Sequence, residues 1–160
     1  MNYRVFDEMG EHPKEDKERQ RHMEEWIQKA FSGTVPKQDG RIYEQMNAEF
    51  WSCDPGERML QVKFPVKDWM LNPNDNMHGG MIATSMDMTC GLLTRYMIAS
   101  GKTSTVELNI NYLSSLHRDE SYIVCAKVKR LGRKMIFLTA EASSREDGRL
   151  AATGTGIFVR

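Results

Sequence analysis

One short segment of the chain brings together residue types that can act on a carbonyl group. Asp87 is the only charged side chain between residues 79 and 94, in a stretch that is otherwise apolar or small. Gly79 and Gly80 open this stretch, where the first amides of a helix lack intrahelical acceptors and carry partial positive charge. An amide at such an end can stabilise a carbonyl oxygen as it becomes an oxyanion, and His78 can add contact or orientation.

Asp87 follows Gly80 by seven residues, about two turns of an α-helix, so both lie on the same side of that helix. The carboxylate can therefore act as a general base or as a nucleophile. Each residue also has a structural explanation: Asp87 as a buried acid paired with a neighbouring hydroxyl or amide, His78 as a loop residue, and the glycines as a point of tight packing. For any of these residues taken alone, the structural explanation is favoured.

A helix from Gly79 to Ala99 must position these groups. Its residues are apolar or small on nearly every side, which predicts that protein or lipid surrounds it. Asp87, four hydroxyl residues and Arg95 would be costly in hydrocarbon, so we expect a buried core helix rather than a membrane span. Cys90 lies one turn beyond Asp87 in apolar surroundings that support a thiolate poorly, and we interpret it as a packing residue.

Runs of alternating or β-branched residues on both sides of this helix predict five or six strands. The expected strands cover residues 43–52, 57–66, 105–113, 121–131, 135–143 and 149–159. In the third of them, Val106, Leu108, Ile110 and Tyr112 are expected on one face, and the other face is polar. The order of elements offers no crossover helices to join parallel strands. We therefore predict an α+β fold, with a curved antiparallel sheet wrapped around one long central helix.

The chain has 160 residues, with 22 basic and 22 acidic side chains. We predict one globular domain, residues 39–160, and an N-terminal extension, residues 1–38, with an amphipathic helix at about residues 14–31. The balanced charge gives no overall field that would attract nucleic acid or an anionic membrane. Three scattered cysteines argue against a disulfide framework and a zinc site. With no secretion signal, we expect a cytoplasmic protein without metal, nucleic-acid or membrane partners.

The residues described above belong to an ordered set, which consists of Asn72, His78, Gly79, Gly80, Asp87 and the run TVELNINY from Thr105. The turn at Gly132–Lys134 and the ending DGRLAATGTGIFV continue the pattern. From about Tyr43 onwards, the chain thereby resembles the hotdog-fold acyl-CoA thioesterases of the phenylacetate-degradation type, which are like 4-hydroxybenzoyl-CoA thioesterase. The resemblance implies dimers joined edge to edge, often tetramers, with active sites at the dimer interface. It implies no cofactor, with coenzyme A present only as part of the substrate.

The resemblance also assigns roles by position. Asp87 matches the catalytic carboxylate, which acts as base on water or as nucleophile, and Gly79 matches the amide that polarises the thioester carbonyl. Asn72 and His78 match residues that enter from the partner subunit and position the water or the thioester. Thr105 falls where the family has Ser or Thr near the attacking water. Many relatives carry a glycine in the loop before His78, and its absence here bears on the placement of Asn72.

Substrate contacts are predicted at less specific positions. Residues that flank the site in sequence are candidates to line an acyl pocket or its approach, namely Gly80, Met81, Trp69 and Met70. Arg133 and Lys134 are candidates for contact with the phosphates of coenzyme A, although cations in a turn more often serve solubility. The sequence leaves open the acyl group, the choice between dimer and tetramer, and the role of the N-terminal helix.

The leading hypothesis for function is hydrolysis of an acyl-CoA thioester to a free acid and coenzyme A. The alternative is a non-catalytic module that binds acyl-CoA or an acyl carrier, since related hotdog domains also serve as binding modules. The intact Asp87 and the lack of an output module in residues 1–38 favour the enzyme. A hydratase or dehydratase ranks third, because no histidine follows Asp87 before His117.

Overall fold

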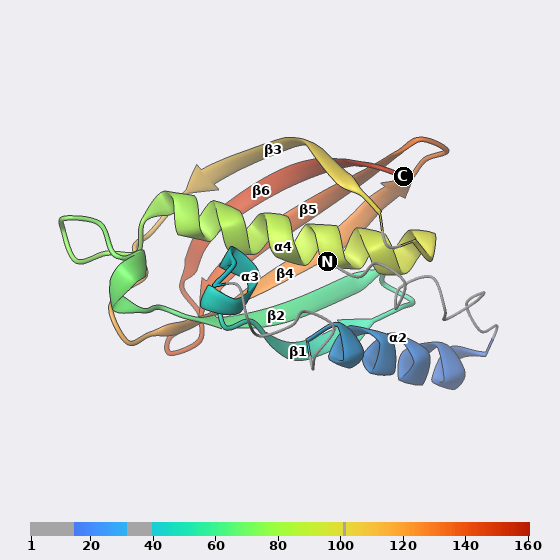
Figure 1. The fold of residues 1–160 in the computed structure, drawn as a ribbon, viewed down its shortest axis with the longest axis horizontal. Coiled ribbons are helices and arrows are strands. Elements are labelled where there is room, and N and C mark those ends of the chain that lie inside the picture. The colour runs from blue at the N-terminus through green and yellow to red at the C-terminus, as the bar shows by residue number, and fades with distance from the viewer. Residues whose placement is uncertain (1–14, 32–39, 101) are drawn as a thin grey trace.

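Six strands form one curved sheet around a long helix, as Figure 1 shows in a computed structural model, which describes residues 15–31, 40–100 and 102–160. The helices are α2 (Asp16–Phe31), α3 (Ile42–Gln45), the 3-10 helix η1 (Asp68–Met70) and α4 (Gly79–Ile98). The strands are β1 (Glu49–Asp54), β2 (Met59–Pro65), β3 (Ser104–Tyr112), β4 (Ser121–Leu131), β5 (Met135–Ser144) and β6 (Leu150–Val159). They lie in the order β1-β2-β4-β5-β6-β3, and every neighbouring pair is antiparallel. The predicted α+β architecture is confirmed.

The central helix α4 begins at Gly79, as predicted, and is buried on most sides. It lies across the concave face of the sheet (Figure 1). The helix ends at Ile98, and Ala99 follows in the left-handed conformation with a φ of 48°, a position that glycine usually takes. Within the described ranges, no helix is long and apolar enough to span a membrane.

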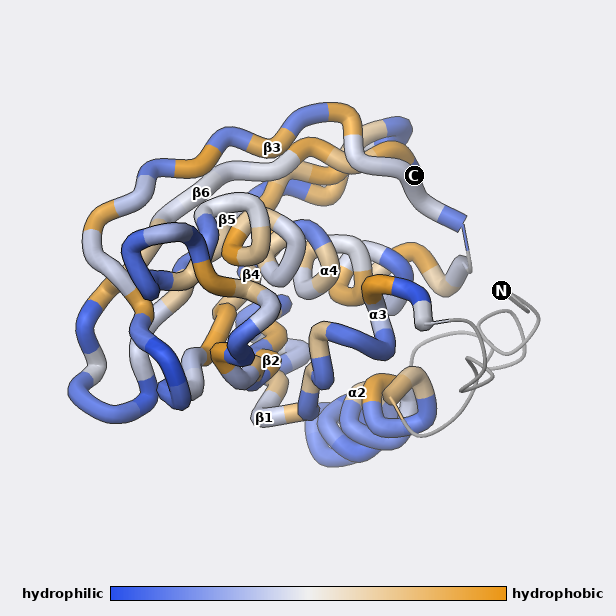
Figure 2. Tube along the Cα trace, turned by 60° about the vertical axis from the view of Figure 1, so that its left-hand side comes forward, coloured by the Kyte–Doolittle hydropathy of each residue, from blue (hydrophilic) through white to orange (hydrophobic). Residues whose placement is uncertain are grey.

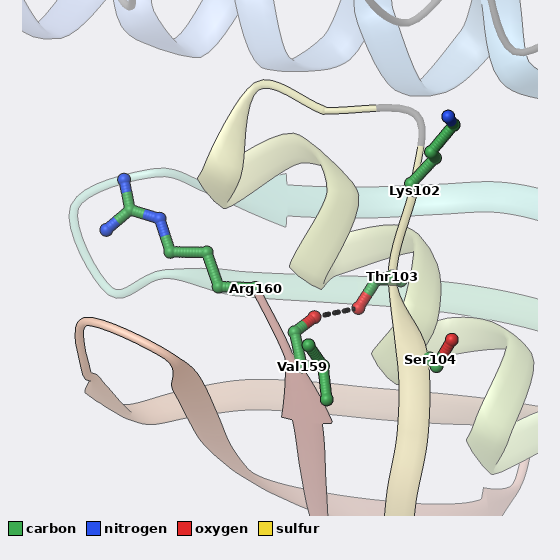
Figure 3. Close-up of a pocket in the computed structure, with 5 residues that line it drawn as sticks. All are labelled: Lys102, Thr103, Ser104, Val159 and Arg160. Atoms are coloured by element: carbon green, nitrogen blue, oxygen red, sulfur yellow. Dashed lines mark hydrogen bonds between the residues drawn. The ribbon is translucent and has the colours of Figure 1, made fainter.

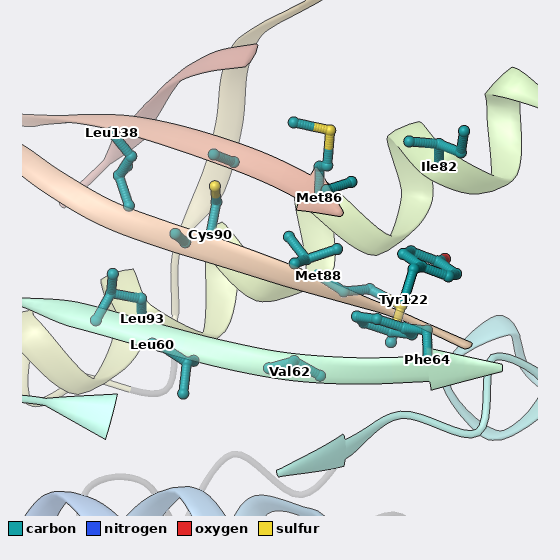
Figure 4. Packing of buried hydrophobic residues seen from close by; sticks show 14 of the residues in the cluster. Leu60, Val62, Phe64, Ile82, Met86, Met88, Cys90, Leu93, Tyr122 and Leu138 are labelled. Carbon is teal, nitrogen blue, oxygen red and sulfur yellow. The ribbon is translucent and has the colours of Figure 1, made fainter. Parts of the chain in front are cut away.

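The hydrophobic core fills the space between α4 and the sheet. Figure 4 shows side chains of β2, β4 and α4 packed against one another. Phe64 on β2 stacks on Tyr122 of β4 with ring centroids 5.5 Å apart, and both side chains are fully buried. Because such a close-packed interior resists displacement, α4 is a rigid support for the residues on its remaining open side.

The N-terminal helix α2 packs on the outer strand β1 and on the end of α4. Most of α2 is hydrophilic (Figure 2), but Met23, Trp26 and Ile27 are buried in the common core. Trp26 meets the ring of Tyr96 edge-on at 5.5 Å. The start at residue 14 and the predicted stop after residue 31 lie outside the described residues, and the domain division at residue 38 stays a prediction. Of the roles left open for this helix, the structure favours covering the sheet edge.

Two strand predictions begin too early. Residues 42–45 form a helical turn in place of the start of the first strand, because the amides of Gln45 and Met46 donate to carbonyls four residues back. Asn47 then reverses the chain with a φ of 48°, and β1 starts only at Glu49. The second strand starts at Met59 rather than at residue 57, since the preceding turn continues through residue 58.

Candidate active site

The two side chains predicted to lie nearest the reacting water are in contact. The Thr105 hydroxyl donates a hydrogen bond to Oδ1 of Asp87 at 2.6 Å. Asp87 lies in the middle of α4 and is half-buried, and Thr105 is the second residue of β3. The other carboxylate oxygen, Oδ2, has no partner among the residues that the structure describes. Asp87 is therefore oriented by one oxygen and keeps the other available for chemistry.

A bulge in β3 brings Thr105 to this position. The pairing of β3 with β6 is irregular between Thr105 and Glu107, so that Thr105 pairs with the buried Phe158. Thr105 consequently faces α4, although strict alternation would place it on the opposite face of the strand from Leu108. Val106, in this irregular segment, is 53% exposed, whereas Leu108 and Ile110 further along the strand are half-buried.

The start of α4 leaves one backbone amide free. His78 caps the helix, since its Nδ1 accepts the N–H of Gly80 at 2.9 Å and its carbonyl accepts the N–H of Met81 at 2.8 Å. The N–H of Gly79 between them has no acceptor in the described part of the chain. The predicted carbonyl-binding amide is thus unoccupied by protein, and His78 has a structural role that fixes its orientation.

Tyr112, which was predicted only to share a strand face with Leu108 and Ile110, is part of this site. Its hydroxyl donates to the carbonyl of Gly79 at 3.0 Å, and the side chain is 53% exposed. A Cβ atom on Gly79 would lie only 3.1 Å from Cζ of this ring, so glycine is needed for the close approach. The sequence signal that could have indicated this role is the hydroxyl of Tyr112, a polar group on an otherwise apolar strand face.

The loop before α4 places Asn72 next to this amide. Oδ1 of Asn72 accepts the N–H groups of Asn74 at 2.9 Å and Asn76 at 3.3 Å, and thereby shapes the loop. Nδ2 of Asn72 has no acceptor within residues 15–31, 40–100 and 102–160 and remains able to donate to a ligand. Asn72, Gly79 and Tyr112 all line one open cleft of about 520 Å³.

The candidate residues form two groups that are separated along α4. We call Asp87 and Thr105 the acid half-site, and Asn72, His78, Gly79 and Tyr112 the amide half-site. Eight residue steps separate Gly79 from Asp87, which at 1.5 Å per residue is about 12 Å. One carbonyl group cannot contact both half-sites of the same chain at that separation.

The predicted substrate-binding residues are spread over several places. Met70 is fully buried, with its carbonyl accepting the His78 N–H at 2.8 Å, whereas Trp69 is 45% exposed. Met81 is half-buried in the first turn of α4, and the amide of Gly80 is taken by His78. None of these contacts tests a role in acyl binding, which stays a prediction.

Arg133 and Lys134 lie in the turn between β4 and β5, at the end of the sheet where β3 begins. The Lys134 carbonyl accepts the N–H of Arg160 at 2.9 Å, beside a shallow cleft lined by Lys102, Thr103, Ser104, Val159 and Arg160 (Figure 3). The side chains of Arg133 and Lys134 are exposed and form no ion pair with any acid in the described ranges.

Cys90 is not suited to act as the nucleophile. Burial raises the pKa of its thiol to about 12, and the nearby Asp87 carboxylate adds to this effect. The packing interpretation of Cys90 is therefore supported. Among the described residues, no group of three or more His, Cys, Asp or Glu side chains is placed so that it could hold a metal ion.

Comparison with known proteins gives matches at the levels of sequence and structure. The model of the thioesterase superfamily matches residues 74–151. Acyl-coenzyme A thioesterase 13 of Homo sapiens is 30% identical over 105 residues, which cover 64% of this chain and 72% of that protein. An acyl-coenzyme A thioesterase of Xenopus laevis is 26% identical over 123 residues, which cover 75% of this chain but only 54% of that longer protein.

Solved structures match over most of the chain. A phenylacetic acid degradation-related protein of Ralstonia eutropha has a TM-score of 0.72 at 23% identity, covering 84% of this chain and 98% of its own. A thioesterase protein of Streptococcus pneumoniae, solved with coenzyme A, has a TM-score of 0.62 at 24% identity, covering 71% and 84%. At these identities the likeness shows the fold, which is the predicted hotdog fold.

Proposed function

Because the chain belongs to the thioesterase superfamily, we propose that it hydrolyses an acyl-CoA thioester to a free acid and coenzyme A. The observation that carries this proposal is the hydrogen bond from Thr105 to Asp87, which orients a carboxylate and leaves its second oxygen free. The bulge in β3 turns Thr105 to that carboxylate, and bulges are over-represented next to active sites.

The proposed chemistry uses both half-sites. The thioester carbonyl accepts the N–H of Gly79, and the donor is worth most when the oxygen becomes an oxyanion. Asp87 takes a proton from water as the water oxygen bonds to the carbonyl carbon; alternatively, Asp87 attacks the carbon itself and water then hydrolyses the anhydride. In both routes the C–S bond breaks, and the thiolate of coenzyme A leaves and takes up a proton. Asn72 donates from Nδ2 to the water or to the thioester.

We further propose that each complete site combines two chains. The separation of about 12 Å along the helix between Gly79 and Asp87 supports an arrangement in which one half-site comes from a second copy. Strand β3 is at the edge of the sheet and is largely exposed. If two β3 strands pair antiparallel around their midpoint, the start of one strand, with Thr105, lies opposite the end of the other, with Tyr112. The acid half-site of each copy then approaches the amide half-site of its partner.

The remaining substrate contacts follow from charge and exposure. We propose that Arg133 and Lys134, together with Lys102 and Arg160, bind the phosphates of coenzyme A, because all four are exposed cations without an ion-pair partner among the described residues. Coenzyme A is present in the S. pneumoniae relative of this fold. Trp69 and Met81 are proposed to contact the acyl group. A cytoplasmic location, and the lack of metal, nucleic-acid and membrane partners, stay predictions.

A panel of short, long and aromatic acyl-CoAs, with a reagent for the released thiol, tests the proposal. We expect turnover of at least one of them, and we expect Asp87→Asn to lose at least about 10²-fold in kcat without a change in thermal stability or oligomeric state. Wild-type rates in Asp87→Asn would refute the catalytic assignment. If one acyl-CoA binds tightly but none is hydrolysed, the chain is instead a binding module.

A further inference from the structure

The loop from Leu71 to Met77, which precedes α4 and carries Asn72, is a small hairpin under backbone strain. Leu71 pairs with Met77, and the N–H of Asn72 donates to the carbonyl of Asn76 at 2.7 Å. Three residues close the hairpin, and the last of them, Asp75, has a φ of 56°. A three-residue hairpin loop commonly has glycine at this left-handed position, because a Cβ atom is unfavourable there.

Asp75 occupies the left-handed position of this loop in place of a glycine. Aspartate tolerates the left-handed conformation better than most residues, but it still loses the conformational ease of glycine. The hydrogen bonds from Asn74 and Asn76 to Oδ1 of Asn72 support the loop from within. These hydrogen bonds lie within the hairpin and do not fix its position relative to the rest of the protein.

Arg118 supplies the missing external support. It lies in the connection between β3 and β4, residues 113–120, and its Nη2 donates to Oδ1 of Asp75 at 3.0 Å. Nη1 of the same guanidinium donates to Oδ1 of Asp68 in η1. Arg118 thus holds two carboxylates that would otherwise repel each other, Asp75 within the hairpin and Asp68 in η1 before it. It joins three segments of the chain through one planar group.

Backbone contacts place the guanidinium at the right point. The N–H of Met77 donates to the carbonyl of Leu116 at 2.8 Å, and Asn76 forms a bridge with His117. The 113–120 connection therefore runs beside the second strand of the hairpin, and its last contact there, His117, directly precedes Arg118. Tyr112, the last residue of β3 directly before this connection, reaches Gly79. The amide half-site is accordingly framed by residues 112–118.

We propose that Arg118 is a positioning residue, which holds the 71–77 loop in the conformation that presents Asn72 to the substrate. The proposal rests on the proposed function for its kinetic consequences, but its structural content does not depend on turnover. Arg118 touches neither water nor thioester in this scheme. Its loss should lower kcat more than it raises KM, because Asn72 acts at the reacting carbonyl whereas the proposed phosphate contacts, Arg133 and Lys134, lie in the β4–β5 turn.

The size of the effect follows from the exposure of the ion pairs. The side chain of Arg118 is 46% exposed and those of Asp68 and Asp75 are 78% and 79% exposed, so solvent screens their attraction. We therefore expect a loss in kcat of roughly fivefold for Arg118→Ala, the scale set by one left-handed residue that is no longer supported. At an ionic strength of about 1 M, the difference between the wild type and Arg118→Ala should shrink, because the screening length falls to about 3 Å.

The decisive experiment compares Arg118→Ala with the double variant Arg118→Ala/Asp75→Gly. Glycine adopts the left-handed conformation without support and removes one repelling carboxylate, so the second substitution should restore most of kcat. Lys63→Ala, which removes a similarly exposed ion pair with Glu49 (3.1 Å) on β1 and β2, is the matched control and should leave kcat unchanged. If the double variant is as slow as Arg118→Ala, or if the control is equally slow, the positioning role is refuted.

Amide hydrogen exchange gives a readout that needs no substrate. In Arg118→Ala, the amides of residues 72–78 should exchange faster while those of the middle of α4 do not change, because the core beneath the loop is intact. An unchanged exchange rate in the loop, or faster exchange throughout the chain, would contradict the proposal. If the wild type hydrolyses no acyl-CoA but the loop responds in this way, the proposed function fails and the positioning role of Arg118 stands.

Discussion

Two inactive variants of this chain should restore activity to each other within one oligomer. Asp87→Asn removes the base or nucleophile from the acid half-site and leaves the amide half-site intact. Gly79→Val does the reverse, since its Cβ would fall 3.1 Å from the Tyr112 ring and its methyl groups would obstruct the Gly79 amide. Each variant alone should lose at least about 10²-fold in kcat, the usual cost of removing an acid–base group or an oxyanion donor.

The expected recovery follows from the geometry of α4. A thioester carbonyl that accepts from the Gly79 amide and is attacked by Asp87 itself requires the two groups to lie within about 7 Å, and one attacked by a water that Asp87 holds requires them to lie within about 10 Å. Gly79 and Asp87 of one chain are about 12 Å apart along the helix. In a mixed dimer, one of the two sites then combines both wild-type halves, and activity should reach about half of the wild-type value per dimer.

Co-expression with two different affinity tags, followed by sequential purification on both, isolates the mixed dimer for assay. Light scattering establishes its mass, and thiol release from the best acyl-CoA of the panel gives the rate. The matched control is the mixed dimer of Asp87→Asn with Asp87→Ala, in which both sites lack the carboxylate. If the Asp87→Asn/Gly79→Val dimer is as inactive as that control, each site is contained in one chain and the two-chain site is wrong.

Three further outcomes are expected. Thr105→Val should lower kcat roughly tenfold, because the Asp87 carboxylate loses the hydrogen bond that orients it. Thr105→Ser should keep this 2.6 Å hydrogen bond and most of the activity. Equal rates for the two variants would exclude this role for the hydroxyl. Trp26→Ala should lower the free energy of unfolding in urea by about 3 kcal/mol or more, because the side chain is only 3% exposed and packs on Tyr96. Burial raises the pKa of the Cys90 thiol to about 12. The contribution of the neutral thiol to the free energy of unfolding should therefore be complete below pH 9 and decrease as the pH rises towards 12. Alkylation with iodoacetamide at pH 8 should modify Cys90 only in denaturant.

Local patterns were enough to predict the helix on which the candidate residues Gly79 and Asp87 lie. The paired glycines, the apolar run and the lone Asp87 marked the start of α4 at Gly79, and the ordered motif brought Thr105 to the same site. These features depend on neighbours within a few residues or on the family pattern. The curved sheet followed because antiparallel strands and one buried helix admit few other arrangements.

Features that depend on distant partners were missed. The bulge at Val106 is visible only in the pairing of β3 with β6, about fifty residues further along the chain. The left-handed Asp75 could not be anticipated, because its support comes from Arg118, 43 positions away in sequence. Tyr112 likewise acquires its role only when the end of β3 reaches Gly79, 33 positions before it. In each of these three features, the conformation or role of the residue depends on a tertiary contact that the neighbouring sequence does not indicate.

One edge of the sheet is covered by a helix and the other is exposed, which supports the two-chain site. At β1 the backbone carbonyl of Cys53 accepts from Gln20 of α2 at 3.0 Å, so that the helix covers this edge. At the other edge, β3 has no such cover in the described residues, although exposed edge strands invite association. Its two ends hold Thr105 and Tyr112, one from each half-site. Strand β3 is therefore free to pair with the β3 strand of a second copy. Because each of its ends belongs to a different half-site, one such pairing would complete two sites at once.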